Sequence, residues 1–165
     1  MNEPDRSVRE AFDDEPPPGE ILAPSPLLTL GAFLVGLGID QVIPLGVLPW
    51  PWNLPLGCVL VVGGGLLFAD ALRTMRAHDK HPSHADEPPE LITEGVYQYS
   101  RNPIYVGHSI AHVGASLLLN TLWPIVTLLP LLGYLRRVVR QEEARLEALF
   151  GQEYERYREE VRRWL

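Results

Sequence analysis

Charge is missing from three long stretches of this 165-residue chain. No Asp, Glu, Lys or Arg occurs in residues 21–39, 41–69 or 104–135. Uncharged runs near or above the ~20 residues that cross a bilayer are rare in soluble domains. The sequence therefore predicts an integral membrane protein, although the average hydrophobic content of 46% looks ordinary.

Cysteine and surplus basic residues are also scarce. Cys58 is the single cysteine and lies in an apolar run, which excludes a disulfide framework and a thiolate metal site. The net charge is -7, and no basic face is left for nucleic acid once the arginines that flank the apolar runs are assigned. We expect no nucleic-acid partner and no metal site, and the sequence leaves the oligomeric state open.

The predicted fold class is all-α: an integral membrane helical bundle of about four transmembrane helices with a C-terminal amphipathic cytoplasmic helix. Residues 1–20 are acidic and proline-rich and predict a disordered tail before a membrane domain at 21–165. The uncharged run after Pro103 would be ~48 Å long as one helix, too long for one crossing, and residues 120–124 supply a turn. The expected spans are about 26–43, 55–72, 103–119 and 122–137, followed by an interfacial helix at about 138–164 with a break near Gly151.

Arginine placement predicts the orientation. Arg73, Arg76, Lys80 and Arg101 flank the middle loop, and three more arginines follow the last span, whereas the opposite connections carry almost no charge. By the positive-inside rule, both termini and the middle loop are cytoplasmic, which fits four spans in an inner membrane.

The turn before the third predicted span favours anion binding. Asn102 is a preferred helix N-cap and Pro103 suits the first helical position, so a helix should begin here. Its first N–H groups have no partners inside the helix, and its dipole is positive at that end. With Arg101, Tyr97 and Tyr105 nearby, this helix start is suited to a carboxylate.

Two adjacent carboxylates, Glu142 and Glu143, lie just past the last predicted span on the same side. The plain interpretation is a solvated helix surface. The alternative is a pair of acceptors for an ammonium or sulfonium. Combined with the helix start at Asn102, the pair would match the charges of an amino-acid-like ligand.

Several short motifs occur in a fixed order from about residue 91 to the C-terminus. They are Gly95-Val-Tyr97, Arg101-Asn102-Pro103-Ile-Tyr105-Val-Gly107, Glu142-Glu143-Ala-Arg-Leu146, Phe150-Gly151-Gln-Glu153-Tyr154 with Tyr157, and Val161-Arg-Arg-Trp164-Leu165. Their order and spacing resemble the isoprenylcysteine carboxyl methyltransferase family, more closely its small bacterial members and the related phospholipid methyltransferases.

The resemblance implies an S-adenosylmethionine-dependent methyltransferase that modifies a lipophilic small molecule or lipid at the cytoplasmic membrane face. Asn102 stands where the eukaryotic enzymes have histidine. Carried over by position, the implied cofactor-binding residues are Leu91, Ile92, Tyr97, Asn102, Pro103, Tyr105 and Glu142.

The resemblance leaves the acceptor side open. The family's substrate-side arginine would fall at Val138, so Arg137 and Arg140 on either side are the candidate substrate-binding residues. Arg101 and Glu143 are the candidate catalytic residues. A carboxylate acceptor needs no general base, whereas an amine must lose a proton, for which Glu143 is the nearest group.

Alternatives to this interpretation are a phospholipid N-methyltransferase and a non-catalytic membrane scaffold. His108 and His112 lie one turn apart and could hold a metal, but interhelical hydrogen bonding is favoured. His78, His81 and His84 are read as part of a flexible loop. The Gly63-Gly64-Gly65 run is expected to let helices pack closely.

Overall fold

A computed structural model describes residues 25–79 and 90–165, and within these ranges the chain is helical without strands. The helices are α2 (Ser25–Asp40), α3 (Asn53–Asp79), the 3-10 helix η1 (Gly95–Gln98), α4 (Pro103–Leu118), α5 (Trp123–Phe150) and α6 (Gln152–Glu160). The all-α prediction is confirmed for this part of the chain. The predicted N-terminal tail and the middle loop with His81 and His84 fall outside the described residues.

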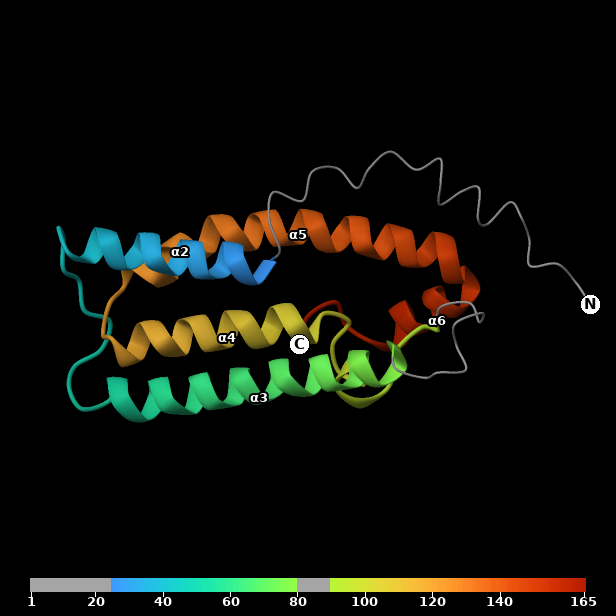
Figure 1. The fold of residues 1–165 in the computed structure, drawn as a ribbon, viewed down its shortest axis with the longest axis horizontal. Coiled ribbons are helices and arrows are strands. Elements are labelled where there is room, and N and C mark those ends of the chain that lie inside the picture. The colour runs from blue at the N-terminus through green and yellow to red at the C-terminus, as the bar shows by residue number, and fades with distance from the viewer. Residues whose placement is uncertain (1–24, 80–89) are drawn as a thin grey trace, which may run out of the picture.

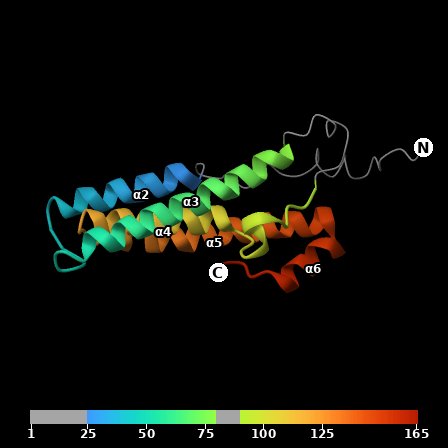
Figure 2. The same cartoon turned by 90° about the horizontal axis from the view of Figure 1, so that it is seen from below.

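The four long helices form an elongated bundle of two pairs (Figure 1). α3 packs closely along α4, and α2 packs along α5, while α4 and α5 meet more sparsely. The turns after α2 and α4 lie at one end of the bundle and α6 lies at the other, while the C-terminus lies between them, near the start of α4 (Figures 1 and 2). The polar motifs of the sequence therefore lie between the start of α4 and the α6 end of the bundle.

Glycines allow the close approach of α3 and α4. A Cβ built on Gly64 would lie 2.6 Å from the backbone oxygen of Gly107, and one on Gly114 would lie 2.6 Å from the backbone nitrogen of Val61. Gly63, the neighbour of Gly64, would meet nothing within 4 Å. The prediction of close helix packing at the triple-glycine run is confirmed, and Gly64 carries it.

One described helix is long and apolar enough to cross a membrane, judged by length and composition: α3 over Asn53–His78. Only 17% of its apolar window is buried inside the protein, whereas the core helix of a soluble protein would be mostly buried. α2 and α4 have 16 residues each, or ~24 Å, which is short of a ~30 Å hydrocarbon core. The number of crossings stays a prediction.

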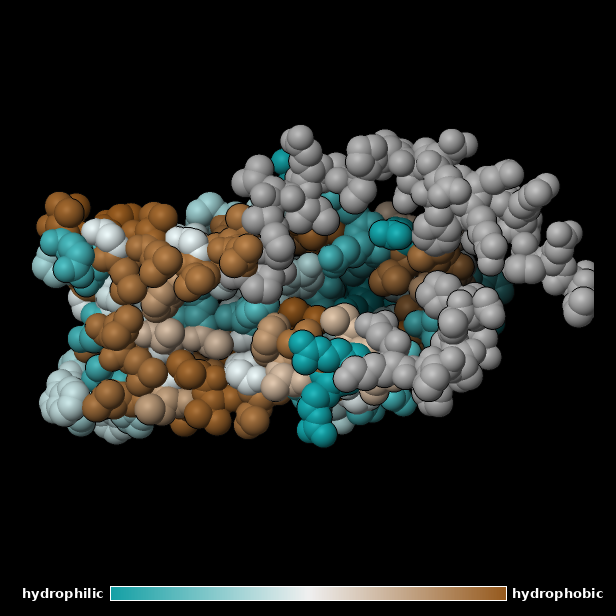
Figure 3. All heavy atoms as spheres, viewed as in Figure 1, coloured by the Kyte–Doolittle hydropathy of each residue, from teal (hydrophilic) through white to brown (hydrophobic). Residues whose placement is uncertain are grey.

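Hydrophobic side chains cover much of the surface toward the turn end of the bundle (Figure 3). Exposed examples on α2 and α3 include Leu30, Leu34, Val59, Val62 and Leu66. Toward the opposite end, hydrophilic side chains are more common among the described residues visible in this view, with some hydrophobic ones between them. This division matches the predicted separation between lipid and the polar face of a membrane.

The predicted boundary between a span at 122–137 and a separate helix at 138–164 is wrong. α5 runs without interruption from Trp123 to Phe150 because the charged segment after Leu135 contains good helix formers and no breaker. The charges mark a change of surroundings and not the end of the helix. Gly151 ends α5 with a φ of 51°, as predicted, but α6 stops at Glu160. At the other elements, α2 ends at Asp40, short of 43, and α3 continues past 72 to Asp79.

Candidate functional site

The start of α4 and the middle of α5 meet through a hydrogen bond. Tyr105 Oη donates to Glu142 Oε1 over 2.8 Å. The two residues are 37 positions apart, and both were predicted from the sequence to bind one ligand. The fold therefore brings the two predicted groups of site residues to one place.

The helix start lies where it was predicted, with Asn102 at the N-cap position and Pro103 in the first turn. The side chain of Asn102 makes no capping hydrogen bond, so its predicted role as a side-chain cap is wrong. Its Nδ2 instead donates to the carbonyl oxygen of Arg163 over 3.0 Å. Asn102 thus fastens the C-terminal residues to the helix start and leaves the N–H groups of the first turn to other acceptors.

Residues 161–165, which we name the C-terminal strap, lie against the turn before α4. The backbone N–H of Arg101 donates to the carbonyl oxygen of Arg162 over 2.9 Å, and Ser100 Oγ donates to that of Arg163 over 3.5 Å. The strap begins where α6 ends at Val161 in extended conformation. Sequence reasoning extended the interfacial helix through this segment and missed these contacts, because hydrogen bonds between residues 61 and 63 positions apart leave no local pattern.

Glu143 is held between two arginines. Arg163 binds it through Nε and Nη2, at 3.0 Å from Oε1 and 2.6 Å from Oε2, and Arg101 Nη2 lies 3.1 Å from Oε1. The side chains of Arg101 and Glu143 are 7% and 10% exposed. Both carboxylate oxygens are thereby engaged, which favours a positioning role for Glu143, and its predicted role as a proton acceptor stays a prediction.

The guanidinium group of Arg101 does not use all of its hydrogen-bond donors. Its Nε and Nη1 are buried and have no hydrogen-bond partner, although buried guanidinium groups are normally paired. Tyr154, whose hydroxyl is also buried without a partner, feels the charge of Arg101. Unused buried donors of this kind suit an anionic group or ordered water.

The electrostatics of the site depend on Glu142. Partial burial raises the pKa of its carboxyl above the ordinary value of 4.5, the hydrogen bond from Tyr105 opposes this shift, and the charge of Glu143 adds to it. Burial, and then the charge of Glu142, raise the pKa of the Tyr97 phenol. Tyr97 thus lies close enough to Glu142 for the charge of the carboxylate to affect its phenol. The backbone oxygen of Tyr97 accepts a 2.7 Å hydrogen bond from Tyr157 Oη.

Leu91 and Ile92 precede η1 on the other side of this region. Leu91 is buried and packs with Tyr154 and Tyr157 of α6, and Ile92 is half-buried. The structure therefore gives Leu91 a packing role beneath α6. The predicted contact of both residues with the cofactor stays a prediction.

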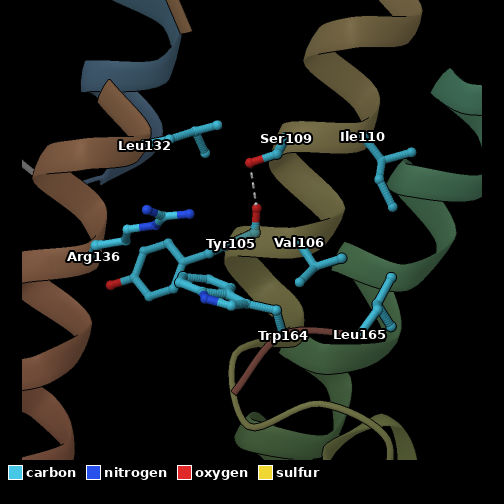
Figure 4. A pocket seen from close by; sticks show the side chains of 8 residues that line it. All are labelled: Tyr105, Val106, Ser109, Ile110, Leu132, Arg136, Trp164 and Leu165. Atoms are coloured by element: carbon cyan, nitrogen blue, oxygen red, sulfur yellow. Dashed lines mark hydrogen bonds between the residues drawn. The ribbon is translucent and has the colours of Figure 1, made fainter. Parts of the chain in front are cut away.

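A cavity of about 390 Å³ lies beside the Tyr105–Glu142 pair, between α4 and α5 (Figure 4). Its lining includes Tyr105, Ser109 and Ile110 from α4, Leu132 and Arg136 from α5, and Trp164 from the C-terminal strap. The lining is mainly apolar, with Tyr105 and Arg136 toward the polar end and Leu132 and Ile110 farther along the helices (Figure 4). Such a space suits an acceptor with a charged end and an apolar chain.

Arg136, and neither predicted arginine, is the cation that lines the cavity. All three arginines are exposed, but Arg137 and Arg140 do not belong to the lining. Helical spacing explains the difference, because Arg136 lies four residues after Leu132 and shares its face of α5. Sequence reasoning had started from the family position at Val138, which is buried. The apolar face of α5 was the signal that could have identified Arg136.

The two histidines of α4 have separate surroundings. His112 Nε2 lies 2.8 Å from the carbonyl oxygen of Pro124 on α5, which confirms the favoured interhelical hydrogen bond. His108 stacks on Phe68 of α3 with 4.4 Å between ring centroids. Their different partners give no support to a shared metal.

Comparison of the sequence with known proteins identifies a family to which it is similar. The model of the phospholipid methyltransferase family matches residues 52–153, well over half of the chain. This segment contains α3, α4 and α5 with the Tyr105–Glu142 pair.

Several curated relatives share one name, protein-S-isoprenylcysteine O-methyltransferase. The mouse protein is 31% identical over 121 residues, which cover 68% of this chain and 43% of the relative. The Schizosaccharomyces pombe protein is 39% identical over 72 residues, 43% of this chain and 30% of the relative. A rice (subspecies indica) protein described as a probable member is 33% identical over 109 residues, 64% of this chain and 57% of the relative. The chain thus spans less than two thirds of each relative's length.

Proposed function

The chain belongs to the phospholipid methyltransferase family, and on this premise we propose that it transfers a methyl group from S-adenosylmethionine to the carboxylate of a lipophilic acceptor. The observation that carries the proposal is the Tyr105–Glu142 hydrogen bond beside an apolar cavity with Arg136 in its wall. The names of the curated relatives support an O-methyl transfer.

The residues on the polar side fit the donor. Bound S-adenosylmethionine supplies a methyl carbon that is activated by its sulfonium. Glu142 would hold a cationic part of the donor, and the buried, unpartnered donors of Arg101 together with the first turn of α4 would hold its carboxylate. Tyr97, Asn102, Pro103 and Tyr105 would shape this pocket, and Leu91 and Ile92 would support it from beneath η1.

The acceptor side needs alignment more than acid–base chemistry. A carboxylate is already a nucleophile at neutral pH, so the protein has to hold it in line with the methyl group and exclude water. Arg136 would orient the carboxylate, while Leu132 and Ile110 would receive the apolar chain. Glu143, with Arg101, would keep the helix start in position.

The membrane setting follows from the exposed apolar surface of α2 and α3. We place the polar end of the bundle at the cytoplasmic face of an inner membrane, with both termini on that side, from the arginine distribution. The acceptor would reach the cavity from the bilayer between the two helix pairs, and the donor would come from water.

Methylation of a phospholipid amine is the main rival, and the family description favours considering it. An amine acceptor must first lose a proton. Glu143 is the nearest carboxylate after Glu142, but its oxygens are bound by two arginines. The carboxylate acceptor avoids this requirement and is our choice.

Calorimetry on the purified protein in detergent tests donor binding. We expect the intact protein to bind S-adenosylmethionine and Glu142→Gln to weaken binding about tenfold or more, because the charge-assisted contact with a cation becomes a neutral one. Glu147→Gln is the matched control, since Glu147 lies farther along α5 and pairs with exposed Arg158. If the intact protein binds no donor, a non-catalytic scaffold becomes the better interpretation.

Paired arginine variants test the acceptor side. Arg136→Gln should raise KM for an N-acetylated S-prenyl cysteine about tenfold, because a charge-assisted contact is lost, while donor affinity stays unchanged. Arg137→Gln, which removes the neighbouring arginine outside the cavity lining, should leave both constants unchanged. Equal effects of the two variants would contradict the assigned role of Arg136.

A further inference from the structure

The 3-10 helix η1 contacts both α3 and α6. Its first residue, Gly95, has a φ of 60° and lies so close to α3 that a Cβ would meet Thr74 Oγ1 at 3.0 Å. From α6, Tyr157 Oη donates a 2.7 Å hydrogen bond to the backbone oxygen of Tyr97, 60 residues earlier in the chain. These two contacts, one at each helix, fix the place of η1 in the protein.

The hydroxyl of Tyr157 supplies a donor that the backbone after η1 does not provide. The N–H of Ser100 donates to the carbonyl oxygen of Val96 over 3.3 Å, and the N–H of Arg101 donates to the C-terminal strap over 2.9 Å. Both groups are thereby engaged away from the carbonyl of Tyr97. The position of this carbonyl therefore depends on α6, although η1 itself is a local structure.

Tyr157 is well held for this contact. It is 7% exposed and packs with Leu91 and Tyr154 in the cluster beneath α6. Burial raises the pKa of its phenol, an effect that the charge of Arg101 opposes, so the hydroxyl stays protonated near neutral pH and remains a donor.

The side chain of Tyr97 lies close enough to Glu142 for the carboxylate to affect its phenol. Glu142 in turn accepts the hydrogen bond from Tyr105. All three residues are assigned to the donor in the proposed function. A shift of the η1 backbone would therefore move the Tyr97 ring relative to the other two.

We propose that Tyr157 is a positioning residue that holds the Tyr97 ring in the donor pocket through the backbone of η1. This inference rests on the proposed function and extends the support of the donor site to α6, where sequence reasoning placed no site residue. Tyr157 acts through Tyr97 and needs no contact with the donor. Without its hydroxyl, the Tyr97 carbonyl has to bond to water or another donor, and η1 can shift.

Calorimetry of donor binding tests this role. Tyr157→Phe removes only the hydroxyl and should weaken binding of S-adenosylmethionine about fivefold, the equivalent of one ordinary hydrogen bond. Tyr99→Phe removes the hydroxyl of a residue that is 68% exposed just after η1, and this matched control should keep the wild-type affinity. In methyl transfer, Tyr157→Phe should raise KM for the donor and leave KM for an N-acetylated S-prenyl cysteine unchanged.

A double-mutant cycle separates positioning from a general loss of stability. Tyr97→Ala should weaken donor binding by itself. In that background, Tyr157→Phe should have little further effect, because the ring that the hydrogen bond positions is gone. The proposal is overturned if Tyr157→Phe weakens binding equally in both backgrounds, or if Tyr97→Ala binds the donor as well as the wild-type protein does.

Amide hydrogen exchange on the wild-type protein gives a second test, which decides the question if Tyr157→Phe does not fold. Addition of S-adenosylmethionine should slow exchange in η1 and also in the part of α6 around Tyr157, because the hydrogen bond couples the two segments. Slower exchange in η1 alone would contradict the coupling.

The outcomes distinguish this inference from the proposed function. If the wild-type protein binds S-adenosylmethionine and Tyr157→Phe binds it equally well, the positioning role is overturned and the proposed function stands. If the wild-type protein binds no S-adenosylmethionine, the proposed function fails, and the inference fails with it.

Discussion

In the proposed function, Glu142 is the residue whose charge is most directly linked to ligand binding. Its pKa is raised above 4.5 chiefly by partial burial. A raised pKa means that the ionised form is disfavoured in the folded protein, so this group contributes most to stability below its unfolded pKa and loses that contribution as pH rises through the folded pKa. A bound cation acts in the opposite direction, because it favours the ionised carboxylate.

Because burial favours the protonated carboxyl of Glu142 and a bound cation favours the ionised form, binding of the donor should depend on pH. The affinity for S-adenosylmethionine should fall as pH decreases through the raised folded pKa of Glu142, and the fall should begin at a higher pH than for an ordinary glutamate. Calorimetry between about pH 5 and pH 8 measures it. Glu142→Gln should bind more weakly and lose this pH dependence. A pH profile that is the same in the two proteins would show that Glu142 does not contact the donor's cation.

Residue-level reasoning from sequence correctly brought two distant motifs together. Tyr105 and Glu142 were expected to lie near each other, and the structure joins them by a hydrogen bond, while their binding of one ligand stays a prediction. Asn102 illustrates the limit: its N-cap position was predictable, but its side chain bonds to Arg163, 61 residues away. The position of Arg136 in the cavity wall was missed because it depends on which face of α5 borders the cavity.

At the scale of helices, the contact between α3 and α4 depends on missing side chains. A Cβ on Gly64 would lie 2.6 Å from both Gly107 O and the backbone nitrogen of Ala111, so the helices would have to separate. Gly64→Ala should therefore lower the melting temperature in detergent substantially. Gly63→Ala, which meets open space, should be neutral or stabilise the protein by up to about 1 kcal/mol. Equal melting temperatures for the two variants would contradict this packing.

The ion pairs of Glu143 with Arg101 and Arg163, which we name the charged clasp, give the next prediction. Glu143→Gln removes the partner of buried Arg101 and of Arg163, and should destabilise the protein by about 3 kcal/mol, the lower end for a broken buried pair. Glu147→Gln, which breaks a pair whose side chains are 43% and 41% exposed, should cost less than about 1 kcal/mol. Denaturant unfolding of both variants measures the difference. A result in which Glu147→Gln is the more harmful change would refute the structural role of the clasp.

Sequence patterns predicted where individual helices begin or end better than they predicted the length of a helix. The helix start at Pro103 and the end at Gly151 have clear chemical signals and were predicted. The length of α5 was underestimated because charge was taken to end the span, although charged residues continue a helix readily beyond a membrane edge. The strap was taken as helix because Val161 and Trp164 continue the amphipathic spacing.

For the whole molecule, the account predicts opposite sides for the two ends of the bundle. Gln41 and Gln98 are both exposed, one in the turn after α2 and the other in η1. In a Cys58→Ser background, a charged maleimide should label Gln98→Cys but not Gln41→Cys in sealed inside-out vesicles, because the polar end is assigned to the cytoplasm. Labelling of Gln41→Cys alone would reverse the orientation, and labelling of both in intact vesicles would contradict a membrane-spanning bundle.

The overall arrangement could be anticipated only in part. Four apolar helical segments were predicted, and the structure contains them as α2, α3, α4 and the first half of α5. Their pairing, with α3 on α4 and α2 on α5, depends on side-chain fit such as that at Gly64 and leaves no simple periodic signal. The cavity arises from this pairing, since it lies where α4 and α5 meet sparsely.

Transfer of a labelled methyl group tests the central claim most directly. Membranes that contain the protein are incubated with S-adenosylmethionine carrying tritium in its methyl group, and the lipid extract is divided into base-labile methyl esters and phospholipids. We predict label in the lipophilic base-labile fraction with the wild-type protein and little with Glu142→Gln. No transfer by folded wild-type protein, or label confined to phospholipid headgroups, would contradict the account.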